Sequence, residues 1–171
     1  NEPTYSFSSS DNRRQYIRET RLDSDEYQFS SAHGLVVERE GAAIASHLLA
    51  TSGGATGVHD HSLVIVGDSC VLAVGPYLVC LSLPALKVLW SVEADAATVF
   101  GVYLSNDSSF LLSHGELTVS RVSLEGELLW QAGGADIFRE GFSVHDSYVQ
   151  AVDFEQREYR FDLATGDSSA G

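Results

Sequence analysis

The tripeptide His59-Asp60-His61 is the densest group of side chains in the sequence that could do chemistry. If it belongs to a strand, residues 59 and 61 point to the same face and their imidazoles are neighbours. Two imidazoles and a carboxylate, such as that of Asp68, are a donor set that binds zinc or another divalent metal. His59, Asp60 and His61 are therefore a candidate metal site, and a metal-dependent enzyme is one functional hypothesis.

A second interpretation of this tripeptide needs no metal. Residues 51–57 have the composition of a loop, and residues 63–66 are an apolar run that predicts a strand. The tripeptide would then be the polar end of the loop that enters the strand. A similar order, His-Asp-Ser, occurs at residues 145–147. Its recurrence favours a structural element of a repeat over a unique site.

Sequence signatures of other common active sites are missing. The chain has no Gly-x-Ser-x-Gly motif, which positions the nucleophilic serine in many hydrolases. The glycine-rich run at 53–57 lacks the Lys and the helix that follow a phosphate-binding loop. We therefore expect no cofactor, and we expect that the protein is not an enzyme.

The charge balance argues against two classes of partner. The 171 residues include 10 basic and 24 acidic side chains, which gives a formal net charge of −14. Nucleic-acid binders present a basic face, and peripheral membrane proteins use Lys and Arg against anionic lipid, so both classes are disfavoured. The acidic excess either keeps the protein in solution or steers it toward a basic partner. No apolar run is long enough to predict a transmembrane helix.

The two cysteines, Cys70 and Cys80, do not have the spacing of a zinc site. They flank a predicted turn at Gly75-Pro76, so the register of the two strands decides whether they can form a bridge. A two-residue loop places Cys70 opposite Leu81, whereas a loop with an odd number of residues places it opposite Cys80. We favour two buried free thiols, because cysteine is among the most buried residue types.

An Asp-Ser pair recurs every 39 residues, at Asp68, Asp107 and Asp146. Each pair precedes an apolar run, a tight turn and a second run, which together predict two paired strands. An Asp carboxylate can accept a hydrogen bond from the backbone N–H two residues on, so it suits such a turn. We interpret the three residues as structural markers at the start of each β unit. No segment has a capped helical stripe, so we predict an all-β fold.

The units also end alike. Residues 82–87 lead to Val88-Leu89-Trp90, and residues 123–127 lead to Leu128-Leu129-Trp130. Trp90 and Trp130 therefore occupy equivalent positions, 40 residues apart. Either both pack in the sheet core, or they form an aromatic platform for a ligand.

These endings resemble a known family of repeats. Residues 162–167, Asp-Leu-Ala-Thr-Gly-Asp, resemble the Asp-x-x-Thr-Gly turn of quinoprotein-type (pyrroloquinoline-quinone-like) β-propeller repeats. The strands that end in Trp90 and Trp130 resemble the strand that follows that turn. The resemblance covers about residues 63–167, and it implies four-stranded blades of 39–40 residues. Residues 84–86, Pro-Ala-Leu, depart from the turn pattern in the first copy.

The number of copies bears on closure of a propeller. Three copies are clear, and a fourth, degenerate copy is expected in residues 27–66, after a flexible polar and charged arm at 1–26. Because about four blades are needed for closure, we predict a minimal or incomplete propeller in a single domain, 27–171. A β-barrel or an open stack of sheets is the alternative. The sequence has no Met, so we expect a processed or trimmed chain.

Three functions from different classes follow. The first is a non-enzymatic binding or protein-interaction module, because propellers serve as scaffolds for many functions. Its partner would be another protein, or a second copy that covers exposed edge strands in a homodimer. The second is an acidic inhibitor or immunity-type protein that neutralises a basic partner. The third is the metal-dependent enzyme that uses His59, Asp60 and His61.

Overall fold

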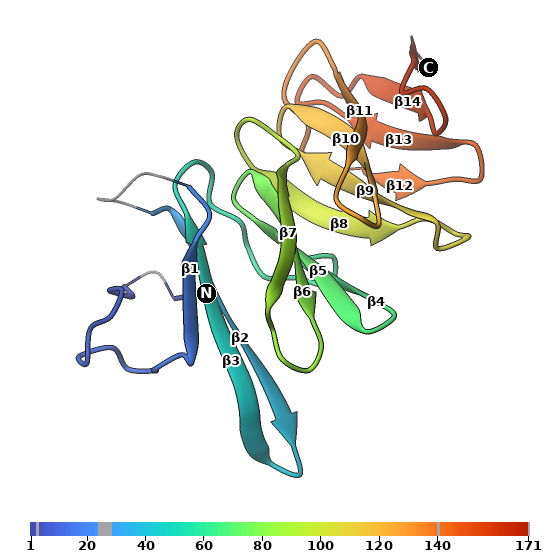
Figure 1. Cartoon of the computed structure of the whole chain (residues 1–171). Coiled ribbons are helices and arrows are strands. Elements are labelled where there is room, and N and C mark those ends of the chain that lie inside the picture. The colour runs from blue at the N-terminus through green and yellow to red at the C-terminus, as the bar shows by residue number, and fades with distance from the viewer. Residues whose placement is uncertain (3, 24–28, 140, 171) are drawn as a thin grey trace.

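The computed structural model describes residues 1–2, 4–23, 29–139 and 141–170. All regular secondary structure in these residues is β-strand (Figure 1). They contain no helix, and hence none that is long and apolar enough to cross a membrane. The predicted all-β fold is confirmed.

Three four-stranded antiparallel sheets follow one another along the chain, and we call them blades 1 to 3. Blade 1 contains β4 (Leu63–Val66), β5 (Ser69–Val74), β6 (Tyr77–Ser82) and β7 (Val88–Glu93). Blade 2 contains β8 (Val99–Leu104), β9 (Phe110–Gly115), β10 (Thr118–Ser123) and β11 (Leu128–Gly133). Blade 3 contains β12 (Ser143–Val144), β13 (Tyr148–Val152), β14 (Glu158–Asp162) and β15 (Ser168–Ala170). Each blade is a meander with its own sheet, so the alternative of a β-barrel is wrong.

The Asp-Ser pair lies between the first and second strands of each blade. The sequence interpretation, which places it at the start of the unit, is therefore one strand late. The apolar run at 63–66 does predict β4, but the first strand of blade 3, β12, is hard to recognise because it has two residues. So few residues carry almost no periodic signal.

A fourth sheet precedes the blades and is built differently. It contains β1 (Arg18–Arg21), β2 (Ser31–Arg39) and β3 (Ala42–Thr51) in the order β1-β3-β2. The predicted hairpin turn at Glu40-Gly41 is present, and both residues have positive φ. However, β1 pairs parallel to β3. The described part of residues 27–66 therefore contains the β2–β3 hairpin and the first strand of blade 1 in place of a four-stranded meander, and the parallel third strand comes from the segment before it.

The segment predicted as an arm contributes to this sheet. β1 lies within it, and Tyr5 and Tyr16 pack against Leu48 of β3 as buried side chains. A Cβ on Gly34 of β2 would overlap the Tyr16 hydroxyl, so the glycine lets the ring lie on the strand. The predicted boundary at residues 26–27 lies outside the described residues, and the division into arm and domain stays a prediction.

Blade 1 settles the register of the cysteines. The Gly75-Pro76 turn is a two-residue loop, and it places Cys70 opposite Leu81 and Cys80 opposite Val71. Both thiols are free and buried, as expected. Burial raises the pKa of Cys70 to about 11 and also raises that of Cys80, so both stay protonated at neutral pH.

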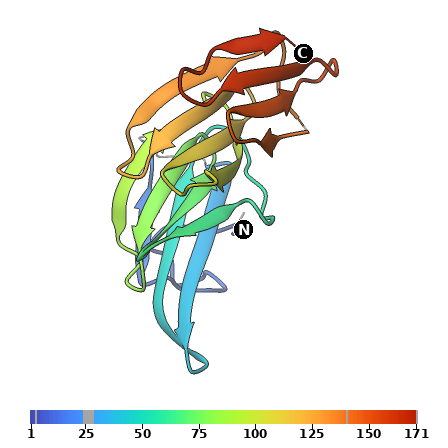
Figure 2. The ribbon, with the colours of Figure 1, turned by 90° about the vertical axis from the view of Figure 1, so that its right-hand side faces the viewer.

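The hydrophobic core lies between the sheets. One cluster joins blade 1 to blade 2, a second joins the β1-β3-β2 sheet to blade 1, and a third joins blade 2 to blade 3. In two perpendicular views the β2–β3 hairpin lies at one end of the molecule and blade 3 at the other (Figures 1 and 2). The described sheets therefore form a row in which consecutive sheets pack against one another.

The two tryptophans join consecutive blades. The Trp90 indole N–H of blade 1 donates to the Leu124 carbonyl of blade 2, and the Trp130 indole of blade 2 donates to the Leu163 carbonyl of blade 3, both at 3.0 Å. Each ring lies over a glycine of the same turn. A Cβ on Gly126 would lie 2.6 Å from the Trp90 ring. Both Trp side chains thus pack between blades.

Candidate functional site

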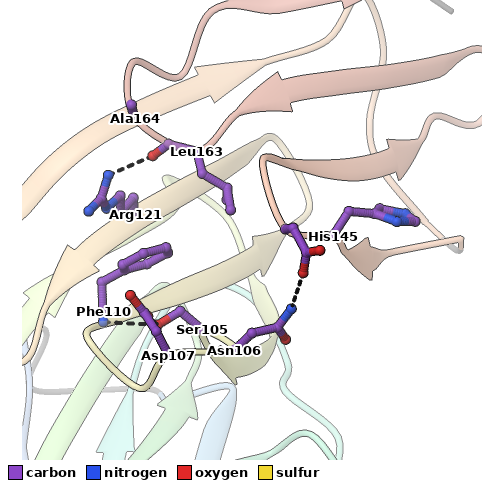
Figure 3. Close-up of a pocket in the computed structure, with 9 residues that line it drawn as sticks. Ser105, Asn106, Asp107, Phe110, Arg121, His145, Leu163 and Ala164 are labelled. Carbon is purple, nitrogen blue, oxygen red and sulfur yellow. Dashed lines mark hydrogen bonds between the residues drawn. The ribbon is translucent and has the colours of Figure 1, made fainter.

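A cleft of about 340 Å³ lies at the junction of blades 2 and 3 (Figure 3). Turns at the ends of β8, β12 and β14 form its rim, and side chains of β9 and β10 form its floor. It is lined by Ser105, Asn106, Asp107, Phe110, Arg121, His145, Asp146, Leu163 and Ala164. Two of the three repeat-marking aspartates therefore line one cleft.

Asp107 stabilises its own turn. Its Oδ1 accepts hydrogen bonds from the Ser109 hydroxyl at 2.7 Å, the Ser105 hydroxyl at 2.7 Å and the Ser109 backbone N–H at 3.1 Å. These bonds, that of the Ser109 side chain first, lower the pKa of Asp107. The carboxylate is consequently anionic, and its Oδ1 is held by the turn.

Asp146 joins two blades. Its Oδ1 accepts a hydrogen bond of 3.0 Å from the Asn106 side-chain amide, across the cleft (Figure 3). The Asp-Ser turns of blades 1 and 3 are also held by backbone bonds, from the Leu83 N–H to the Asp68 carbonyl and from the Leu163 N–H to the Ser147 carbonyl. The carboxylates of Asp107 and Asp146 thus have structural partners, whereas Asp68 is held through its backbone carbonyl.

Arg121 is the cationic residue of the cleft. Its guanidinium carbon lies 3.9 Å from the centre of the Phe110 ring, and its Nη1 donates to the Leu163 carbonyl at 2.7 Å. Its Nε–H is buried and has no hydrogen-bond partner. The cleft thus offers a positively charged donor above an aromatic floor, which suits a carboxylate or carbonyl group of a ligand.

Sequence reasoning missed Arg121, although a signal for it exists. Arg121 is the one charged residue of β10, whose other residues are buried or half-buried. A second arginine, Arg160, follows 39 residues later, and it also lies over an aromatic ring, that of Tyr148, at 5.2 Å. A cation that recurs at the repeat period inside a predicted strand indicates a specific contact.

A hydroxyl and an imidazole lie next to the cleft. The Ser143 hydroxyl is 3.0 Å from Nε2 of His145, and the His145 ring stacks on Tyr148 at 4.3 Å. Figure 3 shows the imidazole directed away from the cleft. A serine nucleophile needs a third group that orients the base. No carboxylate of the described residues hydrogen-bonds to this imidazole.

The predicted metal ligands lie in an exposed turn before β4. Nε2 of His59 donates to the Phe100 carbonyl at 2.6 Å, and Nδ1 accepts the His61 backbone N–H at 3.2 Å. Both ring nitrogens of His59 are therefore used within the protein. The His61 ring stacks on Tyr103 at 4.3 Å, and the two imidazole centres are 6.3 Å apart.

Within the described ranges, no three His, Cys, Asp or Glu side chains gather as a metal-binding group. Metal binding by His59, Asp60 and His61 stays a prediction, and elemental analysis of purified protein would test it. Coordination by His59 would require its ring to leave the Phe100 carbonyl.

Comparison with known proteins supports the fold. No protein-family model and no curated protein matches the chain. Among solved structures, it is similar to the β-propeller domain of Cps50 (Swd1) from Myceliophteria thermophila, with a TM-score of 0.54 and 15% identity over 67% of this chain and 37% of that one. It is also similar to two computationally designed proteins, Ika4 and Ika8.

For Ika4 the TM-score is 0.54 at 12% identity, covering 67% of this chain and 75% of the other. For Ika8 the TM-score is 0.55 at 12% identity, covering 71% and 40%. The chain therefore spans little more than a third of the Swd1 propeller domain. It has a propeller-like fold of minimal size, which confirms the predicted fold class.

Proposed function

We propose that the chain is a non-enzymatic protein-interaction module on a propeller-like scaffold. The observation that carries the proposal is a repeated apolar pair on the outer strands of blades 1 and 2. Val88 and Leu89 on β7 are 38% and 58% exposed, and Leu128 and Leu129 on β11 are 39% and 45% exposed. Exposed apolar side chains that recur at equivalent positions of two blades are candidates for a binding surface.

The position of these pairs strengthens the proposal. β7 and β11 each stand at the end of the strand order of their sheet, so their outer edges have no partner strand among the described residues. Trp90 and Trp130 anchor the same strands to the next blade through their indole N–H groups. A rigid strand with an open edge and apolar side chains suits a protein partner that adds a strand or covers the edge.

The test is to replace Leu89 and Leu129 together by Ser and to compare photo-crosslinked partners of the wild type and the variant. Val58→Ser is a matched control, because Val58 is 68% exposed but lies in the loop before β4. We expect the double variant to lose the partner and the control to keep it. If the double variant keeps the crosslinked partner, the proposal is contradicted. A robust enzymatic activity that is abolished by changing His59 or His61 would also contradict it.

The same experiment distinguishes a second copy from another protein. If the partner is a second copy of the chain that covers β7 and β11, light scattering gives the mass of a dimer for the wild type and the mass of a monomer for the double variant. A monomeric wild type that still crosslinks a foreign protein through Leu89 assigns the surface to another chain.

The net charge of −14 favours a second candidate function, an acidic inhibitor or immunity-type protein that neutralises a basic partner. Such binding depends on electrostatic attraction and weakens as salt screens it. A partner whose affinity is the same at low and high ionic strength would exclude this candidate.

The assignment of the blades to the quinoprotein type also belongs to this proposal. It is supported by the Asp162–Asp167 turn, in which Thr165 donates its backbone N–H to Asp162 at 3.0 Å. It is further supported by Gly166, which lies beneath the Trp130 ring. The assignment implies a type of blade and no cofactor.

A further inference from the structure

A second cleft, of about 400 Å³, lies between the β1-β3-β2 sheet and blade 1. β1 supplies most of its lining, and the start of β7 supplies the opposite wall. It is lined by Ile17, Arg18, Glu19, Thr20, His47, Lys87 and Val88.

Two cations line this cleft in a strongly acidic protein. The chain has 10 basic residues against 24 acidic ones, and Lys87 is its only lysine. Arg18 and Lys87 are both exposed, and neither side chain has a hydrogen bond or an ion pair in the described structure. The cleft is thus a local basic site within a surface of opposite overall charge.

The one acidic residue of the lining is directed elsewhere. Oε1 of Glu19 accepts the Tyr5 hydroxyl at 2.6 Å, and Oε2 accepts the Ser8 backbone N–H at 2.9 Å. Both oxygens are therefore held by the N-terminal segment that packs over the sheet. Glu19 forms no ion pair with Arg18 or Lys87.

His47 makes the base of the cleft polar and neutral. Its Nδ1 donates to the Leu86 carbonyl at 2.6 Å, and its Nε2 is 2.8 Å from the Thr20 hydroxyl. Burial lowers the pKa of His47. The hydrogen bond to Leu86 raises this pKa by a smaller amount, and the nearby charge of Arg18 lowers it further. The imidazole is therefore neutral at pH 7, and the positive charge of the cleft comes from Arg18 and Lys87.

The cleft is bordered by two edge strands. β1 has β3 as its one neighbour in the described sheet, and β7 has β6. Ile17 is 71% exposed beside β1, and Val88 is 38% exposed on β7. An edge strand beside apolar side chains can accept an extended peptide through main-chain hydrogen bonds, with alternate side chains giving specificity.

We propose that this cleft binds an extended segment of a partner protein in which acidic and apolar residues alternate, added as a strand along β1. Alternate side chains of an added strand lie on the two faces of the sheet. The acidic ones would lie beside Arg18, Thr20 and Lys87, and the apolar ones beside Ile17. This inference rests on the proposed interaction function and names the partner's chemistry and its site.

The first test compares two fluorescent ten-residue peptides by anisotropy at low salt. One alternates Glu with Val, and the other alternates Lys with Val. Because the whole chain carries −14, nonspecific attraction favours the Lys peptide. We expect the Glu peptide to bind at least about tenfold more tightly, which a specific basic cleft can produce against the overall charge. Tighter binding of the Lys peptide overturns the inference.

The second test assigns the binding to the cleft. Arg18→Glu and Lys87→Glu should each weaken binding of the Glu peptide by about tenfold or more, because each replaces an attraction by a repulsion. Arg39→Glu is the matched control, since Arg39 is exposed at the far end of β2 and should leave binding unchanged. If all three variants weaken binding of the Glu peptide equally, the assignment of binding to this cleft is wrong, because the effect then reflects net charge alone.

Amide hydrogen exchange reports on the added strand. The Glu peptide should slow exchange at outward-facing amides of β1, whereas a peptide held by charge alone leaves them unchanged. If the peptide instead binds through Leu89 and Leu129, the Ser double variant loses it while Arg18→Glu retains it. That outcome keeps the proposed function and overturns this site.

Discussion

The junction between the β1-β3-β2 sheet and blade 1 differs from the junctions between blades. Between blades, a Trp of one blade donates to a carbonyl in the turn before the outer strand of the next, and its ring lies over Gly126 or Gly166. At blade 1 the position equivalent to these glycines, four residues before Trp90, is Leu86. Nδ1 of His47 donates to the carbonyl of this residue.

The two kinds of junction fill the space next to this turn differently. All three turn residues have positive φ: 52° at Leu86, 90° at Gly126 and 76° at Gly166. Where a Trp from the preceding blade covers the turn, only glycine leaves room for the ring. Where a hairpin covers it, the turn residue supplies its own side chain, and Leu86 is 1% exposed in the shared core.

The largest expected effect comes from filling the glycine of a Trp junction. Gly126→Ala adds a methyl group 2.6 Å from the Trp90 ring and places a side chain at positive φ. We expect a loss of about 3 kcal/mol in the free energy of unfolding, from overpacking and backbone strain together. Urea denaturation measures it.

Gly41→Ala is the control for the backbone strain of a non-glycine residue at positive φ. Gly41 has φ of 80°, and a Cβ there meets nothing within 4 Å. This variant should lose only about 1 kcal/mol. Equal losses for the two variants would mean that the Trp90 ring yields to the methyl group, and that the glycine serves the turn alone.

A smaller effect is expected from making the first junction resemble the others. Leu86→Gly relieves the strain of a non-glycine residue at positive φ, but it removes a fully buried side chain. The lost burial outweighs the relief, so we expect a net loss of about 2 kcal/mol. An unchanged or increased stability in urea denaturation would show that Leu86 is not needed to fill the junction.

The smallest expected effect is a pH dependence of stability that comes from the His47 junction and not from the tryptophan junctions. Burial lowers the folded-state pKa of His47. The unfolded state therefore binds the proton more strongly, and the free energy of unfolding decreases as the pH decreases below about 6.5. No tryptophan junction has a titrating group in its hydrogen bond. His47→Asn keeps a donor for Leu86, and it should make the decrease in stability between pH 7 and pH 5 less steep.

Urea denaturation at both pH values checks this prediction. Buried His33 and His114, whose pKa values burial lowers to about 4, add the same acid sensitivity to the wild type and to the variant. The difference between the two proteins therefore isolates His47. An identical slope would show that the pKa of His47 is the same in the folded and the unfolded state.

Much of the architecture could be predicted from local pattern. The period of the Asp-Ser pair, the two-residue turn at Gly75-Pro76 and the equivalent tryptophans are properties of short segments, which turn chemistry and hydrophobic runs determine. β1 could not be predicted, because its sequence, Arg-Glu-Thr-Arg, is polar. It is a strand because it pairs with β3 and because Tyr5 and Tyr16 cover the sheet.

The candidate sites depended more strongly on tertiary structure. His59-Asp60-His61 is the most conspicuous group in the sequence, yet the ring nitrogens of His59 are used by Phe100 and His61. Asp95 has no distinguishing sequence pattern, yet it is 1% exposed and its carboxylate accepts backbone N–H bonds from Ala97, Leu117 and Thr118. Residue type alone does not show which polar groups are already occupied.

The sequence by itself determined that this chain is a row of β units with a period of 39–40 residues. That information is local, and it repeats. Only the tertiary structure decided that Trp90 and Trp130 lie over glycines of the next blade, and that Arg18 and Lys87 border one cleft. Contacts between sheets join residues tens of positions apart, and their partners are fixed by how the sheets pack rather than by the pattern of any one segment.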